Sequence, residues 1–268
     1  MKAYLNYFKL RFLNILQYRA AAISGIATQL FFGFAIIMVY IALYSSNDQS
    51  NLPMTLRETI SYMWLGQAFF GLTHVYTKDQ DLLTMIKNGN LAYELIRPQD
   101  FYFKFYVKIV SEKVASVVLR FWPIVIVAIL LPMPYNLSAP ISIPAFLIFI
   151  LGLGIAGLLT CALSLLVHMI VMFLLDSRGI FSFYTVIAEL FMGAIVPIPF
   201  LPKVLQKIAM LLPFRYITDF PYRIYTGNIP TSEGVTLLGM SILWLTIIIL
   251  IGYLLSKRAL KKAVIQGG

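Results

Sequence analysis

The sequence is poor in charged residues: only 12% of its 268 residues are Asp, Glu, Lys or Arg, whereas 60% are apolar. A soluble globular domain carries about 25% charged residues, so this composition argues against a soluble fold. The apolar residues are grouped into long runs. At least four of these runs hold no charge over the roughly 17–25 residues that a helix needs to cross a bilayer. The sequence therefore predicts an integral membrane protein of the all-α class.

Cysteine and histidine are almost absent, which excludes several kinds of reactive site. The single cysteine, Cys161, lies inside an apolar run, so neither a disulfide framework nor a zinc spacing is available. We interpret it as a packing residue. His74 and His168 lie near opposite ends of different runs, without the H-E-x-x-H spacing of a zinc site. We interpret both as interfacial or bundle contacts, and we expect no metal site.

The motifs of common enzyme classes are also missing. The chain has no G-x-S-x-G nucleophile elbow and no G-x-x-x-x-G-K-[ST] phosphate loop, and Asp79 and Asp81 belong to no aspartate cluster. We therefore predict that the chain is not an enzyme. It is expected to have no catalytic residues, to bind no cofactor and to hydrolyse no nucleotide by itself.

The apolar runs predict six membrane spans, which are Ala20–Tyr44, Ile60–Thr77, about Phe105–Leu131, Ile143–Leu175, Ile180–Leu201 and Val235–Ser256. Lys and Arg residues near the span ends set the orientation of such a protein. Fifteen of them fall on the side of the N-terminus and five on the other side, so both termini are predicted to be cytoplasmic. Because the basic residues gather at span ends, the net charge of +10 does not indicate a nucleic-acid partner.

The predicted parts form one transmembrane domain over residues 1–268. Residues 1–19 carry apolar side chains at helical spacing, which predicts a helix lying in the cytoplasmic headgroup layer. A simple cytoplasmic extension of the first span is the alternative. The other parts outside the membrane are a cytoplasmic loop over 78–104, an extracytoplasmic segment over 202–234 and a cytoplasmic tail over 257–268.

The fourth run, Ile143–Leu175, is longer than a bilayer requires. Its 33 uncharged residues would form about 50 Å of helix against roughly 30 Å of hydrocarbon, so it must tilt, protrude or break. The G-x-G-x-x-G pattern at Gly152–Gly157 lacks the preceding strand of a dinucleotide-binding unit, and we reject that function. Small residues at every fourth position instead predict a face for close helix approach, at Gly152, Ala156, Thr160 and Ser164.

Two ionisable residues fall inside predicted spans, Arg120 in the third and Glu189 in the fifth. Charges at such a depth are costly unless they are paired or hydrated, so each is a candidate for function. The alternative is that they pair with each other, or with a partner subunit, and fix the register of the helices.

An apolar segment with several prolines, Gly193–Gly227, follows the fifth span. Within it Val204–Leu212 is amphipathic but too short to cross a membrane. Broken apolar helices at a membrane face are typical of re-entrant or interfacial pieces that line or cap a pathway. We therefore predict a proline-rich re-entrant segment on the outer side.

The order of these parts resembles the type-2 permeases of ATP-binding-cassette exporters. "GNLAYELIRPQDFYFKFY", Gly89–Tyr106, is similar to the Gly…Leu-x-Arg-Pro loop of a prokaryotic subfamily, and Pro197–Gly227 is similar to its outer segment. The resemblance implies a half-transporter in a bacterial or archaeal cell membrane, paired with an identical or a sister permease. It also implies a separate ATPase subunit that binds ATP and Mg, and export of drugs, antimicrobial peptides or lipid-linked molecules.

The resemblance also implies two sets of site residues. The loop 78–104 would hold a coupling helix docked in a groove of the ATPase, and Asp79–Lys87 has the acidic start and basic end of a short helix. Its contacts would be Leu82, Leu83 and Ile86, or Leu91 and its apolar neighbours, with Glu94 and Arg97 as charged contacts. The substrate path would be lined by Trp64, Gln67, Phe70, Glu189 and Met192. A solvated loop and ordinary helix packing are the respective alternatives.

Two other functions stay open at this point. An ion-coupled secondary transporter would favour inverted repeats and more intramembrane carboxylates than the one seen here. A membrane-embedded enzyme acting on lipid would need a cluster of carboxylates or histidines, which the sequence does not offer. Neither alternative requires a separate ATPase.

Overall fold

The structure is a computed structural model that describes residues 2–75, 78–88, 94, 98–174 and 178–266. Its α-helices are α1 (Lys2–Leu16), α2 (Arg19–Ser46), α3 (Leu56–Ala68), α4 (Phe70–Thr73), α5 (Gln80–Lys87), α7 (Phe101–Leu130), α8 (Ile143–Val171), α9 (Arg178–Met192), α10 (Lys203–Leu211), α11 (Asp219–Thr226) and α12 (Thr231–Gln266). Short 3-10 helices occur at η1 (Gln49–Asn51), η2 (Ile198–Phe200) and η3 (Pro213–Tyr216). These residues include no strand, which confirms the all-α class.

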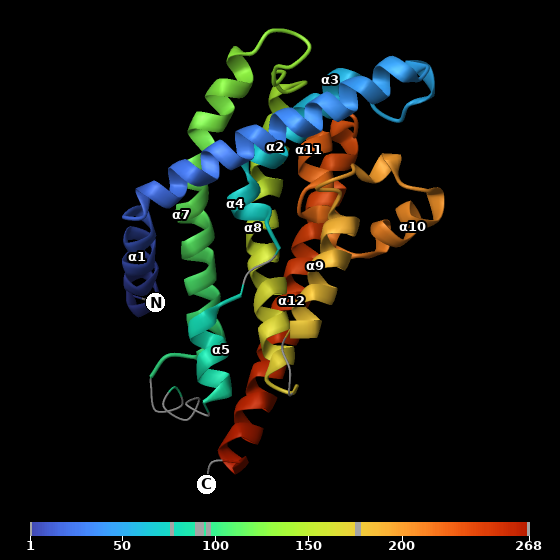
Figure 1. Ribbon diagram of the computed structural model, residues 1–268. Coiled ribbons are helices and arrows are strands. Elements are labelled where there is room, and N and C mark those ends of the chain that lie inside the picture. The colour runs from blue at the N-terminus through green and yellow to red at the C-terminus, as the bar shows by residue number, and fades with distance from the viewer. Residues whose placement is uncertain (1, 76–77, 89–93, 95–97, 175–177, 267–268) are drawn as a thin grey trace.

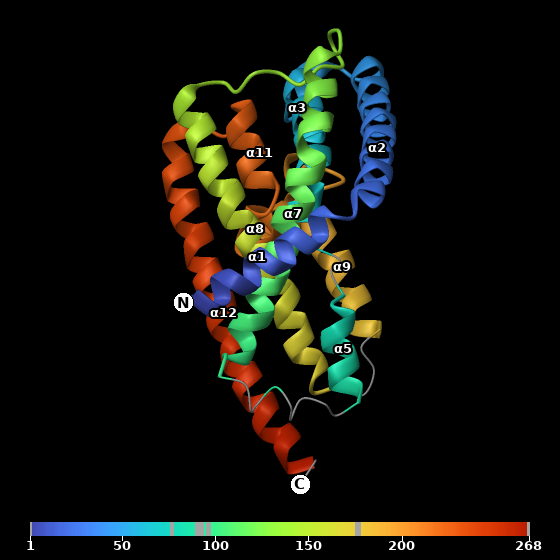
Figure 2. The same cartoon turned by 90° about the vertical axis from the view of Figure 1, so that its left-hand side faces the viewer.

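Three long helices, α7, α8 and α12, run along the height of the molecule, and α12 packs against α8 (Figure 1). The helix α2 crosses the upper half of the molecule at a large tilt to them. From its lower end, α1 continues at an angle and packs on α7 (Figure 2). The lower end of the molecule carries α5 and the C-terminus, whereas the connection between α7 and α8 lies at the upper end.

Four helices of the described residues are long and apolar enough to cross a membrane, namely α2, α7, α8 and Thr231–Lys261 of α12. They correspond to the first, third, fourth and sixth predicted spans. The chain is therefore a multi-pass membrane protein. The second and fifth predicted spans are built differently, and their crossing of the membrane stays a prediction.

The second predicted span, Ile60–Thr77, is not one continuous helix. α3 begins at a capping box, in which the side chains of Thr55 and Glu58 accept each other's backbone N–H, and it ends at Ala68. After the short α4, the backbone becomes extended at His74, with ψ of 124°. Lys113 of α7 donates from Nζ to the His74 carbonyl (2.5 Å), which satisfies an acceptor that the break exposes. The chain then continues to α5 at the lower end.

The fifth predicted span also ends early. α9 stops at Met192 because Gly193 has φ of 78°, a left-handed conformation that side-chain-bearing residues rarely adopt. The carbonyls at this helix end accept hydrogen bonds from other elements: the Tyr62 hydroxyl donates to Gly193 O (2.8 Å) and Thr218 donates to Met192 O. The end of α9 is therefore fixed by α3 and by the segment before α11.

The outer segment contains the predicted short amphipathic helix, which is α10. It projects to one side of the bundle (Figure 1), while α11 returns the chain to α3 and α8. The structure thus confirms short helices separated by prolines. That the segment re-enters the membrane stays a prediction.

Of the fourth predicted span, Ile143–Val171 forms one unbroken helix, α8, whose face of small residues is buried. Gly152, Ala156, Thr160 and Ser164 all lie inside the bundle, as their spacing predicted. A Cβ added at Gly152 would lie 3.1 Å from Cε1 of Phe220 in α11, which is closer than ordinary van der Waals contact. The small residues therefore allow a neighbouring helix to approach closely.

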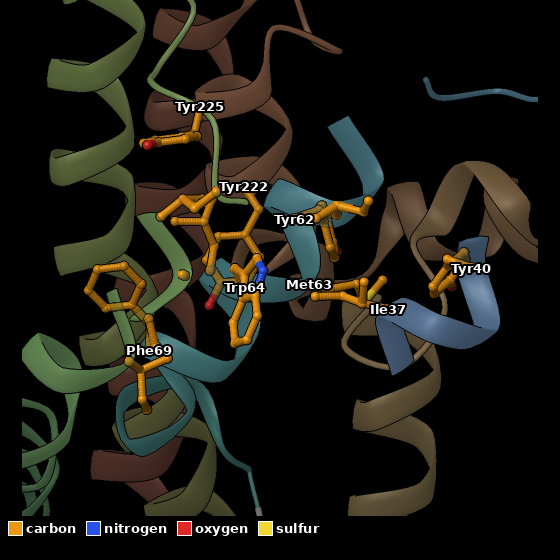
Figure 3. Packing of buried hydrophobic residues seen from close by; sticks show 14 of the residues in the cluster. Ile37, Tyr40, Tyr62, Met63, Trp64, Phe69, Tyr222 and Tyr225 are labelled. Carbon is orange, nitrogen blue, oxygen red and sulfur yellow. The ribbon is translucent and has the colours of Figure 1, made fainter. Parts of the chain in front are cut away.

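An aromatic core joins the upper parts of α2, α3 and α11 (Figure 3). Trp64 is fully buried there, and its Nε1 donates to the carbonyl of Tyr135 (2.7 Å). The rings of Tyr62 and Tyr222 meet edge to face, with centroids 5.3 Å apart. Trp64 and Tyr62 each donate a hydrogen bond to a backbone carbonyl outside α3, so these two side chains hold α3 against the neighbouring segments.

Candidate functional site

A network of buried charges holds the short helix α5 to the long helices. Asp79 is the N-cap residue of α5, and its carboxylate accepts a hydrogen bond from the backbone of Leu82 (3.0 Å). Lys108 of α7 lies with Nζ 2.7 Å from Asp79 and also 2.7 Å from Asp81. Arg11 of α1 lies 3.9 Å from Asp81. The network therefore connects α1, α5 and α7 at the lower end of the molecule.

His168 of α8 also belongs to this network, because it contacts the backbone of Asp79. Its Nε2 accepts a hydrogen bond from the backbone N–H of Asp79 (3.0 Å), so Nε2 carries no proton. Its Nδ1–H can then donate to the carbonyl of Ser164 (2.8 Å). The contacts thus define a neutral imidazole with the proton on Nδ1. This confirms the interpretation of His168 as a bundle contact.

Asp81 is the exposed member of the network, with 62% of its side chain accessible. The hydrogen bond from Lys108, and then the charge of Lys108, lowers the pKa of this carboxyl. Its contribution to stability is therefore present above the ordinary pKa of an aspartate and is lost as the pH falls through the lowered value. Because solvent screens an exposed pair, this contribution is small.

The predicted coupling residues occupy different environments. Leu82 is buried with side chains of α7 and α8, and Leu83 is buried with side chains of α8 and α9. Ile86 is half-buried against both groups. These leucines therefore expose no face to a partner, because the helices of their own chain cover them.

The charged coupling residues can be located only in part. Glu94 is buried and forms an ion pair with Lys104 of α7. Leu91 and Arg97 lie outside the described residues. Among the α5 residues whose side chains are described, the exposed ones are polar, namely Gln80, Asp81 and Thr84. Docking on an ATPase stays a prediction, and the described exposed side chains of α5 that could take part in it are polar and not the predicted leucines.

A cavity of about 310 Å³ lies among α2, α3, α4 and α9. Four of the five residues predicted for the substrate path line it, namely Gln67, Phe70, Glu189 and Met192. The fifth, Trp64, is buried in the aromatic core and does not line it. The structure therefore brings together residues from the second and fifth predicted spans, as expected for a shared path.

The first span also contributes to this cavity, which the sequence analysis did not predict. Thr28, Gln29 and Phe32 of α2 line it. Gln29 is 6% exposed, and a buried amide within an otherwise apolar run is the sequence signal that could have identified it. Among the described lining residues Glu189 is the single carboxylate, so the cavity joins apolar walls to one acidic group.

Arg120 lies apart from Glu189. It lines a second cavity, of about 210 Å³, and no ion pair joins the two residues in the described structure. The guanidinium packs on α2, where a Cβ added at Gly25 would lie only 2.7 Å from Cζ of Arg120. Mutual pairing therefore does not explain these two charges.

Within the described part of the chain, no three or more side chains of His, Cys, Asp or Glu come close enough together to hold a metal ion. Cys161 is buried and free, in keeping with its interpretation as a packing residue.

Comparison with known proteins identifies the family to which this arrangement corresponds. A family model described as "ABC-2 family transporter protein" matches residues 26–267 of the chain. No curated protein matches the chain.

Proposed function

Because the chain belongs to the ABC-2 family of transporter proteins, we propose that it is the membrane permease of an ATP-driven exporter. Permeases of this family are the membrane component of a transporter, and the family implies an ATP-binding-cassette ATPase as partner. In the proposal, that ATPase is a separate chain that binds ATP and Mg. The exporter contains two permeases, identical or sister chains, with six spans each and cytoplasmic termini in a bacterial or archaeal membrane.

The position of α5 is the observation that carries this proposal. It lies at the lower end with the C-terminus (Figure 1), and the positive charge around the predicted inner loops supports a cytoplasmic location of that end. Its exposed face would contact the ATPase, while Leu82 and Leu83 anchor it inside the bundle. A force applied to α5 would thus reach α7, α8 and α9 through buried contacts.

The cavity that contains Glu189 is proposed as part of the substrate path. It is bordered by α2 and α9, and both helices expose apolar side chains beside it, including Phe32 (53% exposed) and Val186 (67% exposed). Aromatic and methionine walls suit apolar substrates of varied shape. The proposed substrate is therefore a drug-like, peptide or lipid-linked molecule, and one with a positive charge would gain from Glu189.

Purification from the native membrane tests the proposed partner. A tagged chain extracted gently should bring with it, in a fixed ratio, a second protein that contains a phosphate loop. Repeated absence of such a protein, with the permease itself intact, would contradict the proposal.

A single substitution tests the docking face of α5. Thr84 is exposed on this face, so Thr84→Arg should lower the amount of co-purified ATPase several-fold by placing a bulky charge in the contact. Ser232, which is exposed at the start of α12 near the opposite end, gives the matched control Ser232→Arg. Equal recovery of the ATPase with both variants would show that α5 is not the docking element.

A further inference from the structure

Two basic residues line the cavity beside Arg120, Arg120 itself and Lys113, and neither pairs with a carboxylate among the described residues. Nε of Arg120 is shielded from solvent and has no hydrogen-bond partner among the described atoms. Lys113 is 6% exposed, and its Nζ donates to the carbonyl of His74. None of the ion pairs of the described residues includes either cation. Charges withdrawn from water are costly unless compensated, so the cavity favours an anion.

The charges that line the cavity indicate the charge of this anion. Arg120 and Lys113 contribute two positive charges and Glu112 contributes one negative charge, so the lining carries a net charge of +1. A ligand with a single negative charge balances it. Ser116 adds a hydroxyl that can donate a hydrogen bond to an anionic oxygen. A phosphodiester, which carries one negative charge at neutral pH, fits these requirements.

The cavity is close to one surface of the membrane. Arg120 contacts Gly25, which lies in the second turn of α2. Gly25 follows Arg19, the charged first residue of α2, by six residues, which is about 9 Å of helix, so it lies near the charged end of this apolar helix. A lipid headgroup at that end of α2 could therefore reach the guanidinium of Arg120.

We propose that this cavity binds the phosphodiester of an anionic phospholipid, such as phosphatidylglycerol, from the leaflet next to the junction of α1 and α2. The guanidinium of Arg120 matches two phosphate oxygens, and Lys113 supplies a second positive charge. Glu112, which faces the same cavity, would disfavour ligands with more than one negative charge. The bound lipid would contact α4 and α7, whose residues line the cavity, and is independent of the transported substrate.

Native mass spectrometry of the purified full chain, with any subunits that accompany it, tests this site. The wild-type protein should retain one phosphatidylglycerol in preference to phosphatidylcholine, whose choline adds a positive charge. Arg120→Gln should weaken phosphatidylglycerol binding about tenfold, which corresponds to about 1.4 kcal/mol. Arg57→Gln, at an exposed arginine of α3, is the matched control and should bind as the wild type does.

A second variant changes the cavity without removing its charge. Gly25→Ala places a Cβ against the guanidinium and should also weaken retention of the lipid, whereas Gly239→Ala, where a Cβ meets nothing within 4 Å, should not. Normal retention with both Arg120→Gln and Gly25→Ala would overturn the proposal. So would an equal loss with Arg57→Gln, equal retention of the two lipids, or displacement of the lipid by inorganic phosphate at comparable concentration.

Discussion

Lys108 determines whether Asp79 can remain inside the bundle. Asp79 caps α5 with its carboxylate and is held through its backbone N–H by His168, yet its side chain is only 3% exposed. A buried carboxylate is tolerated when a cation and hydrogen bonds compensate the lost hydration. Lys108 supplies that cation at 2.7 Å, so one side chain of α7 maintains the attachment of α5.

Removing this cation should strongly destabilise the protein. Lys108→Met keeps most of the length of the side chain but leaves Asp79 buried without its cation, and breaking a buried pair in this way costs about 3–5 kcal/mol. Thermal unfolding in detergent measures the effect as a lowered midpoint. The double variant Lys108→Met with Asp79→Asn should recover part of the loss, because Asn also caps helices. A single variant as stable as the wild type would contradict the role given to Lys108.

At the scale of the elements, the sequence predicted the existence of α5 better than its surroundings. The acidic start of Asp79–Lys87 and its apolar spacing predicted the helix, and the N-cap is at Asp79. The same spacing could not show whether Leu82 and Leu83 face a partner or their own bundle, because both require an apolar face. The break in the second span could not be predicted either, because residues 60–75 are apolar enough for a continuous helix. The His74 carbonyl that the break exposes accepts a hydrogen bond from Lys113, a residue distant in sequence.

The turn after α9 also depends on one backbone conformation. Gly193 has φ of 78°, and a Cβ at this position would lie 2.9 Å from the Tyr62 hydroxyl, which donates to the same residue's carbonyl. Gly193→Ala should therefore destabilise the protein by about 1–2 kcal/mol. Gly239→Ala, in the open middle of α12, should leave the stability unchanged or raise it slightly. Comparison of the thermal midpoints of the two variants checks this, and equal midpoints would show that the turn tolerates a side chain.

For the whole molecule, we propose that a second permease covers the surface beside the first cavity, the one that contains Glu189. The sequence analysis placed Gln67, Phe70, Glu189 and Met192 on one path, and they converge on one cavity although they come from separate spans. The sequence analysis could not predict that residues of α2 also line this cavity, because the tilt of a helix is set by its packing and not by its own composition. With α2 included, the cavity is bordered by two helices whose outer faces expose apolar side chains.

Cysteine cross-linking tests whether two identical copies meet at this surface. Val186 is 67% exposed on α9 beside the cavity, whereas Ile129 is 56% exposed on α7. The one native cysteine, Cys161, is buried, so oxidation in the membrane reports on the introduced residue alone. Val186→Cys should give a disulfide-linked species of twice the chain mass, and Ile129→Cys should give little, because in the proposed dimer only the first position faces the second permease. If Ile129→Cys cross-links as efficiently as Val186→Cys, or if neither does, two identical copies do not meet at the surface formed by α2 and α9.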